Sequence, residues 1–230
     1  MGEHWVSIGH SHVGALARAQ AADLDCINFW DHIPPWAPDE TPRRLNDELT
    51  GRVARGRLVI SMIGGQAHTV LGMVEHPRAF DFILPSSPDL PVDETRTIVP
   101  ADAVRAKIEE LALPLLDSVI FIEAAATAPV VHVPPPPPLA DSGRIASQMG
   151  FMWGNFPGQP WVIAPKWVRY KVWRMLCEVT EACCLRHGIR FLPSPAAATD
   201  DDGFLRPEFD LDGAHANGAY GALVLQALGR

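Results

Sequence analysis

The chain has 230 residues, of which 47% are apolar and 20% are charged, and its net charge is −8. This length and composition indicate a globular protein, which we expect to form a single domain over residues 1–230. A negative net charge without any cluster of Lys and Arg excludes nucleic acid from the expected partners.

The first residues lead directly into an apolar strand and do not resemble a signal peptide, so a cytoplasmic protein is expected. The most apolar long stretch, residues 111–133, is interrupted by two prolines, an aspartate and a glutamate. This composition favours a buried helix and strand over a membrane span. The cysteines lack the spacing of zinc ligands, and we expect reduced, buried thiols. These residues are Cys26, Cys177, Cys183 and Cys184.

Apolar strands alternate with helical patterns along the chain. Strands are predicted at residues 4–9, 24–29, 58–63, 130–133 and 189–192. Helices are predicted at residues 12–22, 41–54, 100–126, 165–187 and 216–228. This alternation predicts an α/β fold in which a parallel five-stranded sheet carries helices on both faces.

Three segments do not follow this alternation. A further short strand is expected at 80–84, within a region that is otherwise loop. The five prolines at 134–138 indicate a stiff loop, or alternatively a ligand for a proline-binding partner. Residues 139–164 form a loop-rich insertion, which we expect to be either a lid or a packed loop. Aromatic residues in the loops either bind a sugar or acyl chain or pack the loops down: Trp30, Trp36, Trp153 and Trp161.

The first predicted strand ends in Gly-His-Ser-His at 9–12, and a helical pattern begins directly afterwards. A serine at this junction lies beside unpaired N–H groups at the positive end of a helix, where an oxyanion is stabilised. We therefore interpret Ser11 as a nucleophile. The alternative is that Ser11 only caps the following helix.

A serine hydroxyl needs an imidazole to accept its proton, and that imidazole needs an acceptor that fixes its tautomer. Asp212-Gly-Ala-His215, after the last predicted strand, offers both groups one helical turn apart. A third stretch, Gly-Gly-Gln-Ala-His at 64–68, follows the third strand. Because ligands bind at the carboxyl ends of parallel strands, we expect these stretches to meet there. The predicted catalytic residues are Ser11, Asp212 and His215.

Together these stretches resemble the SGNH, or GDSL-type, hydrolases. Gly9-His10-Ser11 looks like the Gly-Asp-Ser block of that family, and residues 63–68 look like its Gly-x-Asn-Asp block. Residues 212–215, with Asn217 and Gly221 behind them, look like its Asp-x-x-His block. The resemblance implies a three-layer α/β/α, flavodoxin-like fold and a Ser-His-Asp triad that forms an acyl-enzyme. It implies no metal or organic cofactor, and hydrolysis or transfer of an acyl group on an oxygen ester. We expect a small-molecule or glycan ester as substrate and no membrane partner.

The chain departs from the family pattern around the expected oxyanion hole. Gln66 stands where the family has an asparagine that donates to the oxyanion, so the resemblance implies donors in Ser11 and Gln66, with His68 as a substitute. The glycine of the second family block has no counterpart, and the loop at 30–32 occupies its place. Other residues expected to contact the substrate or the oxyanion are His10, His12, Trp30, Gly65 and His68.

Three functions are compatible with these motifs. The first is a serine esterase or acyl hydrolase acting on an oxygen ester. The second is an O-acyltransferase that uses the same triad on a glycan or small metabolite, for which the aromatic loops and the 139–164 insertion could exclude water. The third is a non-catalytic binding protein, suggested by the altered oxyanion blocks. No carboxylate-rich motif accompanies the histidines, so no metal site is expected.

Overall fold

The structure is a computed structural model that describes residues 4–38, 43–64, 66–148 and 162–230. Its central sheet has the strand order β2-β1-β3-β6-β7, and every pairing is parallel. The strands are β1 (Trp5–Gly9), β2 (Leu24–Asn28), β3 (Leu58–Met62), β6 (Val130–His132) and β7 (Arg190–Phe191). Counted along the sheet, this is the 2-1-3-4-5 order of flavodoxin-like folds. The predicted five-stranded parallel sheet is confirmed.

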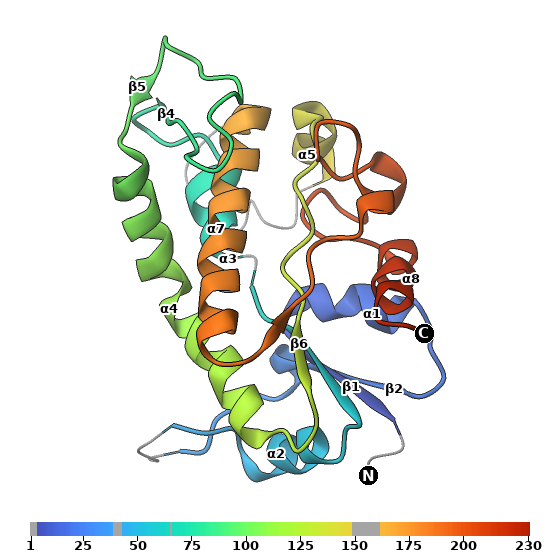
Figure 1. The fold of residues 1–230 in the computed structure, drawn as a ribbon. Helices are drawn as coiled ribbons and strands as arrows, with labels where there is room; N and C mark the ends of the chain where they lie inside the picture. Colours follow the sequence, from blue (N-terminus) through green and yellow to red (C-terminus); the bar gives the residue numbers. More distant parts are fainter. Residues whose placement is uncertain (1–3, 39–42, 65, 149–161) are drawn as a thin grey trace.

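Helices cover both faces of the sheet and make three layers (Figure 1). On one face, α1 (Gly14–Arg18) and α8 (Gly218–Ala227) bury apolar side chains such as Leu16 and Val224 against Ile60 of β3. The other face carries α2 (Asp47–Ala54), α4 (Ala101–Ala125) and α7 (Lys166–Arg186). Successive side chains of β3 point to opposite faces of the sheet. Val59 packs against α2, α4 and α7, and Ile60 packs against α1 and α8.

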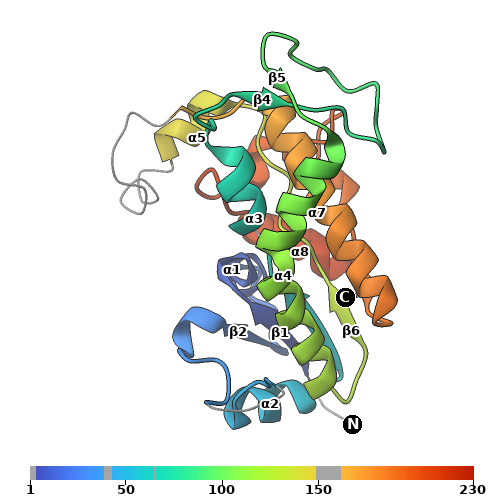
Figure 2. The same ribbon diagram turned by 90° about the vertical axis from the view of Figure 1, so that its left-hand side faces the viewer.

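Short elements connect these layers. The helical turns are η1 (Ser11–Val13), η2 (Phe29–Asp31), α3 (Gln66–His68), η3 (Thr69–Met73), η4 (Ala196–Ala198) and η5 (Pro207–Phe209). A second, two-stranded parallel sheet pairs β4 (Phe80–Asp81) with β5 (Thr97–Ile98). It lies beside the N-terminal ends of α4 and α7 (Figure 2). The sequence indicated one strand at 80–84, because elements of two residues carry too little periodicity to be recognised.

Two predicted helix boundaries are wrong. The first helix ends at Arg18 and not at residue 22, because Gln20 adopts a left-handed conformation with φ of 55°. The second helix begins at Asp47 and not at residue 41. Its start is set by Asn46, whose side chain accepts a hydrogen bond of 2.9 Å from the Leu49 N–H.

All five prolines at 134–138 are buried. The run leaves β6 and passes under α7, where the Trp173 indole donates a hydrogen bond of 3.0 Å to the Pro135 carbonyl. The alternative interpretation, a ligand for a proline-binding partner, is wrong because buried rings cannot be presented to another protein. The run instead forms a stiff wall inside the molecule.

The 139–164 insertion begins with α5 (Ser142–Gln148), and its central part, 149–161, lies outside the described residues together with Trp153 and Trp161. Arg169 of α7 holds both ends of the insertion, although only 2% of its surface is exposed. Its guanidinium donates to four groups: the carbonyls of Leu139 (2.7 Å), Ala140 (2.9 Å) and Ala164, and the Ser142 hydroxyl (2.9 Å).

None of the helices in the described ranges is both long and apolar enough to cross a bilayer. The four cysteines have free thiols. Three of them are buried, as the sequence predicted, whereas Cys26 is only partly buried.

Candidate active site

Ser11 lies directly after β1, at the carboxyl edge of the sheet. Gly9 brings the chain to this point so close to β3 that a Cβ atom there would lie 2.3 Å from the Met62 carbonyl oxygen. The chain then turns into η1, whose first residue is Ser11 and whose cap residue, His10, makes no side-chain hydrogen bond. Ser11 is therefore not the N-cap of η1. Its side chain is exposed, and its hydroxyl points to a residue from a distant part of the chain.

That partner is His215. The Ser11 Oγ atom lies 2.8 Å from His215 Nε2, although 204 positions separate the two residues in the chain. On the other side of the ring, His215 Nδ1 lies 2.9 Å from Asp212 Oδ2 and 3.0 Å from Oδ1. With the Nδ1–H donated to the carboxylate, the Nε2 lone pair faces Ser11 and can accept the serine proton. The structure thus brings together the three residues predicted from the strand-end motifs.

The loop before α8 is folded around the Asp212 carboxylate. Asp212 Oδ1 accepts hydrogen bonds from the backbone N–H groups of Ala214 (3.1 Å) and His215 (2.9 Å). Gly213 has a φ of 86°, a conformation that glycine adopts without strain, and this lets the chain turn back within three residues. The Asp-Gly-Ala-His sequence therefore fixes the carboxylate and the imidazole in one rigid turn.

The pKa of Asp212 is lowered from its ordinary value. Burial acts to raise it, but the hydrogen bonds from the His215 ring and from the two backbone N–H groups together outweigh burial. Asp212 is consequently a carboxylate over the whole neutral range, as an acceptor for the His215 Nδ1–H must be.

A second ion pair supports this loop and was not recognised in the sequence. The Asp210 side chain is 1% exposed. Its carboxylate accepts a hydrogen bond of 2.9 Å from Arg144 Nε of α5 and one of 2.8 Å from the Gly213 N–H. The Asn217 amide also donates to the Asp210 carbonyl, at 3.2 Å. Only the short spacing between Asp210 and Asp212 hinted at a shared loop. Arg144 is 66 positions away, and nothing in the sequence links it to this site.

Three further histidines lie near Ser11. The His12 ring centroid is 5.1 Å from that of His215, and both His12 and His68 are buried. Burial lowers the pKa of His68 to about 4, and burial together with the neighbouring imidazoles lowers the pKa of His12 well below its ordinary value. The Nδ1 atoms of His10, His12 and His68 have no hydrogen-bond partner within the part of the chain that is described. They are neutral imidazoles with hydrogen-bonding capacity to spare.

His68 and His215 border the same small cavity. Its volume is about 10 Å³, which is room for roughly one water-sized group. The proline run forms one wall of it, through Pro136, Pro137 and Pro138. His68 can therefore present a polar group on the side of the site that His215 also faces.

Only some of the other residues predicted to contact the substrate lie where they could do so. Trp30 is 52% exposed, with its ring centroid 5.5 Å from that of His10, which leaves it free to contact a ligand near Ser11. Its backbone N–H donates to the Asn28 side chain at 3.2 Å, so the 30–32 loop does not offer this group to an oxyanion. Trp36 packs between the rings of Phe29 and Phe121. Gly65 and the Gln66 side chain lie outside the described part of the structure.

Among the described residues, no three His, Cys, Asp or Glu side chains form a group that could hold a metal ion. The histidines around Ser11 are thus brought near one another without the geometry of a ligand set.

The buried histidines predict how folding depends on pH. In the unfolded chain they bind protons below pH 6.5, whereas burial lowers the folded pKa to about 4 for His68 and to about 3 for His132. Because the unfolded state binds more protons, stability must fall as pH falls from 6.5 towards 4, by up to about tenfold per pH unit in the folding constant for each histidine.

This dependence can be measured by urea unfolding between pH 4 and 7. His132→Asn is expected to flatten the slope, while the same change at exposed His187 leaves it as in the wild type. A slope that is identical in the His132→Asn and wild-type proteins would contradict the buried, neutral state of His132.

Comparison with known proteins finds similarity in the fold and no match in the sequence. No family model matches the chain, and no curated protein matches its sequence. Among solved structures, the extracellular lipase of Streptomyces rimosus is 15% identical, with 99% of each chain covered and a TM-score of 0.50. Phospholipase A1 of Streptomyces albidoflavus NA297 is 14% identical, with 100% of this chain and 99% of the other covered and a TM-score of 0.50. At such identities the likeness concerns the fold alone. The chain has the fold of the SGNH hydrolases, as its motifs implied.

Proposed function

We propose that the protein is a serine hydrolase of the SGNH type that cleaves an oxygen ester. The single observation that carries this proposal is the continuous hydrogen-bonded series from Ser11 Oγ through His215 to Asp212, with distances of 2.8 and 2.9 Å. A nucleophile, its base and the group that orients the base are the minimum that acyl transfer to serine requires.

In the first step, Ser11 Oγ attacks the ester carbonyl while His215 Nε2 takes the hydroxyl proton. The tetrahedral intermediate then collapses, and His215 gives this proton to the departing alcohol, which leaves an acyl group on Ser11. A water molecule, activated by the same imidazole, attacks the acyl-enzyme and releases the acid. Asp212 stabilises the imidazolium in both steps by accepting the hydrogen bond that Nδ1–H donates.

The oxyanion of each tetrahedral intermediate needs donors. The Ser11 N–H at the start of η1 has no acceptor within its own helix and is the first donor. The resemblance to the family favours Gln66 as the second donor. His68 is the other candidate, because it lines the same cavity as His215 and its buried Nδ1 has no partner among the described residues. A neutral imidazole can donate from one nitrogen, and the low pKa of His68 keeps it neutral.

His68→Ala is expected to lower kcat by about 10²-fold, with little change in KM, because an oxyanion donor acts mainly in the transition state. Steady-state kinetics on a short-chain p-nitrophenyl ester measures both constants. Gln66→Ala in the same assay is the matched variant. If Gln66→Ala loses activity and His68→Ala does not, the second donor is Gln66.

The proposed function is tested by product analysis. The wild-type protein is incubated with p-nitrophenyl acetate and butyrate in water, and then with added glycan and small alcohol acceptors. The free acid as main product supports a hydrolase, whereas acylated acceptor would indicate an O-acyltransferase with the same triad. An absence of any turnover would favour the non-catalytic binding protein.

A further inference from the structure

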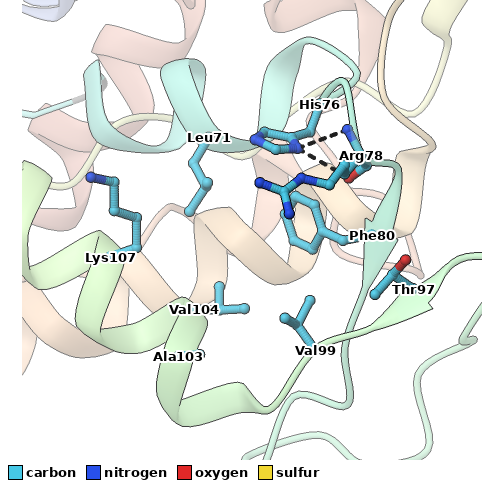
Figure 3. Close-up of a pocket in the computed structure, with 9 residues that line it drawn as sticks. All are labelled: Leu71, His76, Arg78, Phe80, Thr97, Val99, Ala103, Val104 and Lys107. Atoms are coloured by element: carbon cyan, nitrogen blue, oxygen red, sulfur yellow. Dashed lines mark hydrogen bonds between the residues drawn. The ribbon is translucent and has the colours of Figure 1, made fainter.

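A second pocket lies away from Ser11, between the start of α4, the β4–β5 sheet and η3 (Figure 3). Its volume is about 270 Å³. The interior is formed by apolar side chains, of which Val104 and Phe80 are 5% and 9% exposed. The apolar lining residues are Leu71, Phe80, Val99, Ala103 and Val104.

The rim of this pocket is basic. Arg78 and His76 lie at one end of it and Lys107 at the other (Figure 3), and none of the described residues that line the pocket is acidic. The Arg78 guanidinium has no acidic partner within the described ranges. Lys107 pairs with Glu110 at 2.7 Å, but 48% and 67% of these side chains are exposed, and such pairs exchange easily with other charges.

This basic rim is notable on a chain whose net charge is −8. The two nearest carboxylates in sequence do not neutralise Arg78, because Glu75 is bound to Arg96 at 2.6 Å and Asp81 to Lys171 at 2.5 Å. An apolar interior with a positive edge is complementary to a molecule that has an alkyl chain and one negative end.

We propose that this pocket binds a medium-chain fatty acid. The alkyl chain lies among Leu71, Phe80 and Val104, and the carboxylate lies at the rim, where Arg78 can donate two parallel hydrogen bonds to it. The volume of 270 Å³ is just below the range of pockets for drug-sized ligands, which suits a single chain of medium length.

The pocket is distinct from the candidate active site, although η3 contributes to both. Leu71 lines the apolar pocket, and Met73, two residues later, lines the cavity beside His215. Binding to the apolar pocket requires none of the catalytic residues. The proposal therefore does not depend on the proposed function.

Titration calorimetry of the wild-type protein with decanoate tests this inference without any ester being present. Decanoate is expected to bind about tenfold more tightly than octanoate, because two more methylene groups are buried. Decanol and decyltrimethylammonium are expected to bind more weakly than decanoate. Equal affinity for decanoate and decanol, or no binding of decanoate, would overturn the proposal.

Two pairs of variants locate the site. Ala103→Trp fills the pocket from an exposed position of α4 and is expected to weaken decanoate binding by at least about tenfold, whereas Ala106→Trp, outside the lining, is its control. Arg78→Gln is expected to weaken it about fivefold, with Arg55→Gln, on α2's exposed end, as the charge control. Unchanged binding in Ala103→Trp would show that decanoate binds elsewhere and would overturn the proposal.

Discussion

Replacement of Ser11 by alanine is expected to lower kcat for a short-chain p-nitrophenyl ester by about 10⁶-fold, the loss typical of a serine triad without its nucleophile. The reason is geometric, since the Ser11 hydroxyl is hydrogen-bonded to His215 Nε2, at 2.8 Å. The substitution removes one exposed oxygen and leaves the buried core unchanged. Rates are compared by initial-rate kinetics, with a folding control by circular dichroism.

Two matched variants sharpen this expectation. Asp212→Asn keeps the shape of the loop, but the Asn amide donates a hydrogen bond to His215 Nδ1 where the carboxylate accepted one. The imidazole proton then lies on Nε2, which can no longer accept the serine proton, and a loss of about 10⁴-fold in kcat is expected. Ser7→Ala changes a buried serine of β1, the strand that leads to Ser11, and should leave kcat nearly unchanged. The Ser7 hydroxyl donates to the Cys26 sulfur at 3.1 Å and not to His215. Full activity in Ser11→Ala would contradict the role given to this residue.

Replacement of Lys171 by methionine is expected to lower the free energy of unfolding by about 3–5 kcal/mol. Lys171 Nζ lies 2.5 Å from Asp81 Oδ1, and the two side chains are 0% and 2% exposed. The ammonium also donates to the carbonyls of Phe82 (2.9 Å) and Pro91 (3.0 Å). Methionine fits the space, but it leaves a buried carboxylate without its counter-ion, and this cost dominates.

Urea unfolding followed by tryptophan fluorescence measures this loss. Lys166→Met is the control, because its ion pair with Asp202 is 3.4 Å long and about half exposed, and a change within about 1 kcal/mol is expected. Adding Asp81→Asn to Lys171→Met should recover part of the stability, because the unpaired charge is then removed. A loss in Lys171→Met no larger than in Lys166→Met would contradict a buried ion pair.

The architecture was predictable because its signals are local and repeated. The apolar run of β3 indicated a strand covered on both faces, and Val59 and Ile60 do face opposite layers. The parallel sheet in turn made it possible to place Ser11 and His215 together, since both follow strands at the same edge. Without that topological rule, two short motifs 204 positions apart would have remained unrelated.

The supporting interactions could not be predicted for the opposite reason. Arg169 and Lys171 lie within a helix whose charged residues would ordinarily face water, and only the chain packed over them explains their burial. Arg144 reaches Asp210 from an insertion without periodicity. Such contacts depend on tertiary structure, and no spacing in the sequence encodes them.

The oxyanion hole could be predicted only in part from the sequence. The Gly-Gly-Gln-Ala-His stretch was located correctly after β3, but its sequence offers two donors, and the burial of His68 is a tertiary property. The fold alone does not distinguish a hydrolase from a binding protein with the same sheet. A serine that reacts as a nucleophile distinguishes the hydrolase from the binding protein.

The most direct test of the central claim, that Ser11 is an activated nucleophile, is labelling with a fluorophosphonate followed by peptide mass spectrometry. The account predicts one adduct per chain, on Ser11, that disappears in Ser11→Ala and is strongly slowed in His215→Ala. No adduct on the folded wild-type protein, or an adduct on another serine that persists in Ser11→Ala, would contradict it.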